Sequence, residues 1–356
     1  AWLENSAASW QRVDENRHYG LWLYGNMPEY FNRDGSTCIY RMMAAGPHYG
    51  HFNNHWLLYM TTGRPQDIVW AQANTRHWRD VELVHYTTPD IERLPHESRK
   101  VLGAAHAVSV YPWRMGSSFG FYSGCSPMLY DYYLTGDRRS LEAAELHVHG
   151  ALRNMGGCGY DRSHGGHNKL LADWYGHSWD PEVGRKLDEA VNYIATNDPD
   201  AKKSKSATPL NWTNFMPQYL FMSADPASGL KHHAAMREYI LKWVEDALAG
   251  DNFRTGYPGN PGNMLAAAWF ATGERKYLFP YARYMLKYDV PRDQWLTPPA
   301  PGLGSGTGSS RFDEVLFAYA AWRQAVEKGL VPASEGDLPL PPPIKSYRCP
   351  VNGRYY

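Results

Sequence analysis

The chain has 356 residues, of which 36 are Lys or Arg and 36 are Asp or Glu, so its formal net charge is zero. Nucleic-acid-binding proteins usually carry an excess of basic residues, so this balance argues against a general nucleic-acid binder. The sequence contains no apolar run long enough to cross a bilayer, and we therefore expect no membrane span. The length suits one large domain or two modest ones.

A repeated pattern runs through the chain. In three segments an apolar stretch ends at Thr-Gly, a charged turn follows, and a second helical pattern begins: 59–73, 132–146 and 269–283. Gly63, Gly136 and Gly273 suit the position just past a helix, where the backbone often needs a positive φ. Two further segments, 175–190 and 219–235, keep this order but carry Asp-Pro at the turn. Proline suits the first turn of a helix, so these segments also predict paired helices.

The spacing of apolar residues predicts an all-α protein. In 138–153, Leu141, Ala144, Val148 and Leu152 recur at helical intervals. About five such hairpins and one closing helix predict an (α/α)6-type toroid over residues 47–330. We expect an irregular segment, 1–46, packed on the toroid and a Pro-rich tail, 331–356. The tail has two alternatives, a tether across the domain surface and an arm for self-association.

The long connections between hairpins indicate where function lies. They cover roughly 81–118, 154–167, 197–210, 250–261 and 288–310. In a toroid they emerge at one end, where the first helix of each hairpin begins. Loops on a rigid scaffold commonly carry function, and helix amino termini favour anionic groups. We therefore expect the site at this loop-rich end.

Three histidines crowd the predicted start of the first helix, in "PHYGHFNNHW" (47–56). His51 and His55 are four residues apart and could share one helical face, as zinc ligands do. Phe52, however, follows His51 where a zinc protease would carry Glu, so we expect no metal and no cofactor. His48 and His51 are interpreted as part of a ligand cleft and His55 as a packing residue.

The residue types at the loop-rich end suit β-elimination on a uronic acid. This reaction abstracts the C5 proton beside a carboxylate, which a cationic or polar group must neutralise. We hypothesise that Arg79 and Arg114 hold that carboxylate, that His85 or His106 is the base, and that Tyr122 is the acid. Substrate-binding candidates are His48, Tyr49, His51, Asn54, Trp56, Asp80, Trp113, Arg162 and His164. The competing interpretations are salt bridges for the arginines and core packing for the tryptophans.

Two other functions stay open. A glycoside hydrolase acting on uronides would use Asp80 with a second carboxylate. A non-catalytic toroid would bind glycan or form an assembly, and internal pairing of Arg79, Asp80 and His85 would favour it.

Four motifs carry a resemblance to a known family. They are "YGLWLYGNMPEYF" (19–31), "YRMMAAGPHYGHFNNHWLLYMTTGRPQDI" (40–68), "RHWRDVELVHY" (76–86) and "LYDYYLTGDRRSLEAA" (129–144). Over about residues 19–150 the chain resembles the helical toroid of exo-rhamnogalacturonan lyase-type proteins. The family's D-x-x-x-x-H segment matches Asp80 to His85, and its His/Trp loop matches His106 to Trp113. The resemblance implies a secreted or periplasmic carbohydrate-active enzyme, a polysaccharide lyase whose partner is an acidic, pectic or other uronic-acid polysaccharide.

Overall fold

The computed structural model describes residues 30–31, 37–39, 51–86, 102–106, 117–118, 124–154, 162–197, 209–249, 261–277, 321 and 324–330. Their α-helices are α2 (His51–Thr62), α3 (Pro65–His77), α5 (Ser126–Thr135), α6 (Arg138–Asn154), α7 (Arg162–Ser178), α8 (Pro181–Asn197), α9 (Pro209–Ser223), α10 (His233–Ala249) and α11 (Pro261–Thr272). Shorter turns of helix are η1 (Trp78–Glu82, a π-helix), η3 (Pro226–Ser228) and η5 (Arg275–Tyr277). The strands are β1 (Tyr30–Phe31), β2 (Thr37–Ile39), β3 (Ala105–His106) and β4 (Ser117–Ser118).

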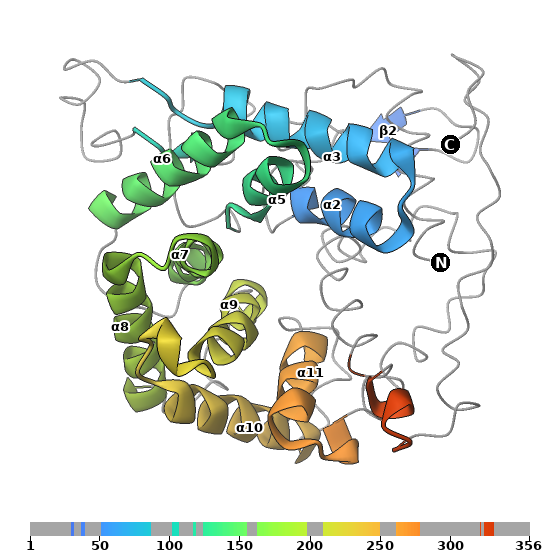
Figure 1. Cartoon of the computed structure of the whole chain (residues 1–356), viewed down its shortest axis with the longest axis vertical. Helices are drawn as coiled ribbons and strands as arrows, with labels where there is room; N and C mark the ends of the chain where they lie inside the picture. Colours follow the sequence, from blue (N-terminus) through green and yellow to red (C-terminus); the bar gives the residue numbers. More distant parts are fainter. Residues whose placement is uncertain are drawn as a thin grey trace.

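The helices form two layers that follow an arc (Figure 1). Helices α2, α5, α7, α9 and α11 contact one another in that order and form the inner layer. Helices α3, α6, α8 and α10 each pack on the preceding inner helix and form the outer layer. The predicted all-α class is therefore confirmed for the described part of the chain. The closure of this arc into a ring of six hairpins stays a prediction.

Short strands occupy a small place in this architecture. β1 pairs antiparallel with β2, with Tyr30 opposite Ile39, and β3 pairs antiparallel with β4, with His106 opposite Ser117. The first pair lies within 1–46, for which the sequence predicted only irregular structure. The tail 331–356 lies outside the described residues.

The turns between paired helices confirm the predicted glycine positions. Gly63, Gly136 and Gly273 have φ values of 68°, 78° and 73°. Trp179 takes the same position after α7 with φ 55°, although it carries a side chain. Each of these four amides donates to the carbonyl of an aromatic residue four positions earlier: Tyr59, Tyr132, Trp269 and Tyr175. Helices α2, α5, α7 and α11 thus share one type of carboxyl end, in which a left-handed residue donates a single hydrogen bond back to the last turn.

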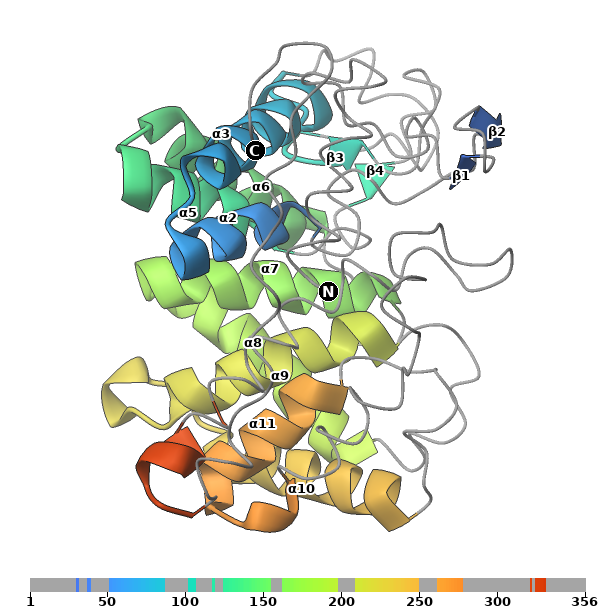
Figure 2. The same cartoon turned by 90° about the vertical axis from the view of Figure 1, so that its right-hand side faces the viewer.

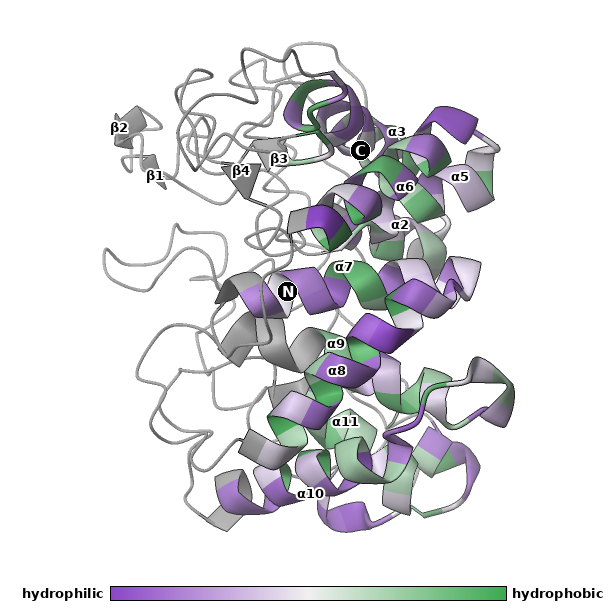
Figure 3. Ribbon diagram, turned by 90° about the vertical axis from the view of Figure 1, so that its left-hand side faces the viewer, coloured by the Kyte–Doolittle hydropathy of each residue, from purple (hydrophilic) through white to green (hydrophobic). Residues whose placement is uncertain are grey.

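The core lies between the two layers and around the inner helices, since residues 264–269 of α11 are all buried. The helical pattern predicted for 138–153 is confirmed, because Ala144 and Val148 are fully buried and Leu141 and Leu152 pack against the same cluster. Helix α8 shows polar residues on its outward face in Figure 3, as expected for an outer helix with one apolar side.

The short turns and the amino ends of the inner helices lie on opposite sides of the described structure (Figure 2). Figure 2 shows the turns between paired helices along one side, and β3, β4 and the first residues of α7, α9 and α11 toward the other. The amino ends of these inner helices therefore share one side of the molecule, as the sequence predicted.

Candidate functional site

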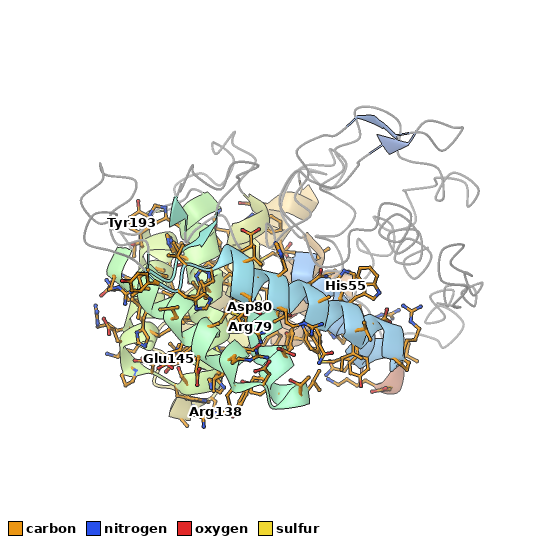
Figure 4. The ribbon with its side chains drawn as sticks, turned by 90° about the horizontal axis from the view of Figure 1, so that it is seen from above. His55, Arg79, Asp80, Arg138, Glu145 and Tyr193 are labelled. Atoms are coloured by element: carbon orange, nitrogen blue, oxygen red, sulfur yellow. The ribbon has the colours of Figure 1, made fainter. Side chains whose placement is uncertain are left out.

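Arg79 lies immediately after α3, within η1, and is almost completely buried. Its Nε and Nη2 donate to the two carboxylate oxygens of Asp80 at 2.6 and 2.9 Å. Its Nη1 donates to Asp137 Oδ2 at 2.8 Å and to Ser140 Oγ at 3.0 Å. Figure 4 shows Arg79 and Asp80 together at the end of the α3 ribbon. Hydrogen bonds to Asp80 raise the pKa of Arg79 further above its ordinary value.

This arrangement corrects the predicted role of Arg79. The sequence predicted a cation at the loop-rich end that holds a substrate carboxylate. The guanidinium instead reaches the short turn between α5 and α6, where Asp137 lies. A buried guanidinium needs hydrogen-bond acceptors to offset the free-energy cost of its desolvation. Asp80, Asp137 and Ser140 supply these acceptors from within the chain. Arg79 is therefore a structural cation.

The neighbouring carboxylates separate into two environments. Hydrogen bonds from Arg79 lower the pKa of Asp80, whose side chain is 52% exposed. Burial raises the pKa of Asp131, which accepts from Ser140 Oγ at 2.5 Å. Asp80 thus stays ionised at neutral pH and cannot donate a proton. Asp131 is only 2% exposed, so a sugar cannot reach it. This pair does not supply the two accessible carboxylates that glycosidic hydrolysis needs.

Of the two predicted catalytic residues whose side chains the structure describes, Arg79 and His85, only His85 is accessible. Its side chain is exposed, and its Nε2 lies 2.5 Å from the carbonyl oxygen of Arg79. A carbonyl oxygen can only accept, so Nε2 carries the proton. In the neutral imidazole the lone pair then belongs to Nδ1, which is able to take a proton from a substrate.

The segment that carries His106 runs beside His85. Val84 N donates to Ala104 O at 2.9 Å, Gly103 N donates to Val84 O at 2.8 Å, and β3 contacts η1. The side chain of His106 is not among those described. The structure therefore brings the backbones of the two candidate bases into adjacent segments.

Helix α6 holds this segment in place. His147 is fully buried, and its Nδ1 donates to Gly103 O at 2.7 Å, while Arg153 Nη2 donates to Leu102 O at 3.0 Å. Gly103 has φ 82°, and a Cβ at this position would lie 2.3 Å from the carbonyl oxygen of Leu146. The close approach of the segment to α6 therefore requires glycine.

Trp56 is a second correction. The sequence proposed it as a surface on which a sugar could stack. Trp56 is fully buried between α2 and α3, and its indole N–H donates to Thr75 Oγ1 at 2.8 Å. Its ring is therefore part of the core, which was the competing interpretation.

The other residues of the first helix follow the prediction in part. Helix α2 begins at His51, so "PHYGHFNNHW" does contain a helix start. Burial lowers the pKa of His55 to about 4, consistent with the packing role predicted for it. The side chains of His51 and Asn54 are not described.

The remaining candidates are located as follows. Arg162 is the first residue of α7, although its side chain is not described, and His164 is partly buried two residues later. His48, Tyr49, Trp113, Arg114 and Tyr122 lie outside the described residues.

A buried polar cluster that the sequence did not predict joins α5, α7 and α9. Asp173 accepts from Ser126 N at 3.2 Å and from Ser126 Oγ at 2.5 Å, and it pairs with Lys169. The ammonium of Lys169 also lies 3.4 Å from Ser126 Oγ and 3.3 Å from Gln218 Oε1. Its three N–H groups thus have three acceptors, so the cluster is a satisfied structural link. The i, i+4 spacing of Lys169 and Asp173 was the available signal.

An aromatic cluster was also missed, at the carboxyl ends of α5 and α7. The hydroxyl of Tyr133 lies 2.7 Å from His177 Nδ1. The His177 ring lies 5.2 Å from Trp174 and 6.2 Å from Tyr132, measured between ring centroids. These rings come from two hairpins, and only their packing reveals the cluster.

The described residues contain no group of three or more His, Cys, Asp or Glu side chains arranged to hold a metal ion. Within the same part of the chain, none of the helices combines the length and apolar character needed to cross a bilayer. Comparison with protein families, curated proteins and solved structures finds no significant match to the chain.

Proposed function

We propose that the chain is a carbohydrate-active enzyme, a polysaccharide lyase that cleaves an acidic, rhamnogalacturonan-like glycan by β-elimination. The observation that carries this proposal is the orientation of His85. An exposed imidazole with Nε2 fixed on a carbonyl and its lone pair on Nδ1 meets the geometric requirement for a general base. A secreted or periplasmic location follows from a pectic substrate of this class.

In the proposed reaction, His85 Nδ1 takes the C5 proton of a uronate residue. The electron pair of the C5–H bond forms the C4–C5 double bond, and the C4–O bond breaks. The departing oxygen takes a proton, for which Tyr122 is the proposed donor. The products are an unsaturated uronide and a shortened glycan.

The guanidinium of Arg79 already donates its hydrogen bonds to Asp80 in η1 and to Asp137 in the α5–α6 turn. The carboxylate of the substrate therefore needs a different cation. Arg114 takes this role in the proposal. Arg79 contributes indirectly, because its carbonyl oxygen orients His85.

One observation favours a non-catalytic alternative. Arg79 and Asp80 pair internally, as expected if this part of the chain serves stability alone. In that case the helical arc binds glycan or forms an assembly without cleaving a bond.

Incubation with pectic, alginate and glucuronan-type polysaccharides tests the class, with the ultraviolet absorbance of the unsaturated product as the readout. His85→Asn should lower the initial rate by about 10²- to 10⁴-fold, the usual contribution of a general base. His149→Asn is the matched control, since His149 is a partly exposed histidine on α6. Glycan binding without product from any of the three substrates would select the non-catalytic alternative. Reducing ends without unsaturated product would select a hydrolase.

A further inference from the structure

The Tyr133–His177 pair is open to solvent. Tyr133 is 54% exposed, and it comes one helical turn before Gly136 at the carboxyl end of α5. His177 is partly buried at the corresponding end of α7. The cluster of Lys169 and Asp173, by contrast, is buried and internally satisfied. This pair combines an accessible aromatic ring with groups able to bind a ligand.

The rings are held in fixed positions before any ligand arrives. Tyr133 and His177 lie 5.6 Å apart between ring centroids, and the hydrogen bond between hydroxyl and imidazole fixes both side chains. Trp174, which is 6% exposed, also packs against the His177 ring. A ligand therefore meets an ordered surface, and little side-chain entropy is lost on binding.

The donor and acceptor groups of the pair suit the hydroxyl groups of a sugar. Burial raises the pKa of Tyr133, so its phenol stays protonated at neutral pH. When the phenol donates to His177 Nδ1, the neutral imidazole presents Nε2 as a donor and the phenol oxygen keeps acceptor capacity. Donor and acceptor groups thus lie beside an exposed ring face.

The local electrostatic field disfavours an anion. Helices α5 and α7 both end beside the cluster, at Thr135 and Ser178, and helix carboxyl ends carry partial negative charge. A uronate carboxylate would be repelled here, whereas an uncharged sugar ring would not. The cluster also lies on the side of the short turns, away from the amino ends of the inner helices (Figure 2).

We propose that Tyr133, His177 and Trp174 form a second glycan-binding site, which takes an uncharged sugar ring of the substrate away from the bond that is cleaved. The ring stacks on the exposed face of Tyr133, and its hydroxyl groups bond with the phenol and imidazole. The choice of glycan rests on the proposed function, but the binding site itself does not require catalysis.

Affinity electrophoresis of the full chain tests this site, with neutral galactan in the gel as the probe and polygalacturonate as the anionic comparison. Tyr133→Ala should weaken retardation on galactan by about tenfold, because it removes the exposed aromatic ring on which the sugar stacks. Tyr133→Phe should retain most of it, because the ring remains. Val69→Ala, at a 58% exposed apolar residue on α3, is the control and should bind as the unmodified chain does.

The outcomes separate this site from the proposed reaction. Loss of galactan binding in Tyr133→Ala, with elimination on short oligouronides unchanged, supports both. Loss of galactan binding by a chain that shows no elimination supports the binding site alone. Equal retardation of Tyr133→Ala and Val69→Ala on galactan overturns the site, as does absence of any retardation of the unmodified chain on galactan.

Discussion

Arg79 and Asp137 are separated by 58 positions in the sequence and joined by a hydrogen bond of 2.8 Å between Nη1 and Oδ2. This bond ties η1, which follows the first described hairpin, to the turn of the second. The same arginine supplies the carbonyl oxygen that orients His85. Residue 79 therefore ties the two hairpins together through its buried guanidinium and orients the proposed base through its backbone carbonyl.

Replacement of Arg79 should be strongly destabilising. Arg79→Met removes the cation and leaves Asp131 and Asp137 close together and partly or fully buried, which should cost about 3–5 kcal/mol of the free energy of unfolding. Urea unfolding measures the loss. Arg139→Met is the control, because Arg139 also pairs with Asp137 but is 70% exposed, and it should have little effect. Equal effects of the two substitutions would contradict a structural role for Arg79.

The buried pair on α7 should behave as a coupled unit. Lys169→Met leaves an unpaired carboxylate and Asp173→Asn leaves an unpaired ammonium, so each should cost about 3–5 kcal/mol. The double variant removes both charges and should cost clearly less than the sum of the two. A double-mutant cycle by chemical denaturation checks this, and strict additivity would show that the two side chains do not interact.

Replacement of glycine by alanine should destabilise the fold less at Gly63 than at Gly103, because their surroundings differ. Gly63 has φ 68° and no atom within 4 Å of an added Cβ, so Gly63→Ala should cost only the left-handed strain, about 1–2 kcal/mol. Gly103→Ala adds a contact at 2.3 Å to the backbone of Leu146 and should be more destabilising. Thermal unfolding of the two variants compares them. Similar losses would mean that the 102–106 segment is not held tightly on α6.

Stability should fall in mild acid because of His147. Burial lowers its pKa from 6.5 to about 4, so the unfolded chain binds a proton more readily than the folded chain. The contribution of neutral His147 to the free energy of unfolding is present above pH 6.5 and is lost as the pH falls toward 4. Between pH 7 and pH 5 the loss should be about 2 kcal/mol.

Urea midpoints at the two pH values measure this dependence. His147→Gln cannot take up the proton, so the difference between pH 7 and pH 5 should shrink by that amount. An unchanged difference would show that His147 is not the source.

Features that depend on near neighbours in the chain were predictable. Helical spacing in 138–153 predicted the burial of Ala144 and Val148, and Thr-Gly predicted the ends of α2, α5 and α11. The start of α2 within "PHYGHFNNHW" was also predicted. These features follow from interactions over about four residues, which the order of side chains already specifies.

The partners of the candidate site residues could not be predicted in this way. The sequence presented Arg79 and Trp56 as ligand-binding groups, and each had a competing structural interpretation. Packing of α3 against α2 and α5 placed Trp56 in the core and directed Arg79 to Asp137. The Tyr133–His177 pair likewise depends on which two inner helices are neighbours.

The amino-acid order specified the helices, their turns and the pairing of successive helices, because backbone hydrogen bonds and hydrophobic periodicity act locally. The assignment of charged and aromatic side chains to the core or to solvent came from tertiary packing. A buried charge must find acceptors wherever the fold brings them, and for Arg79 they lie both next to it and 58 positions away.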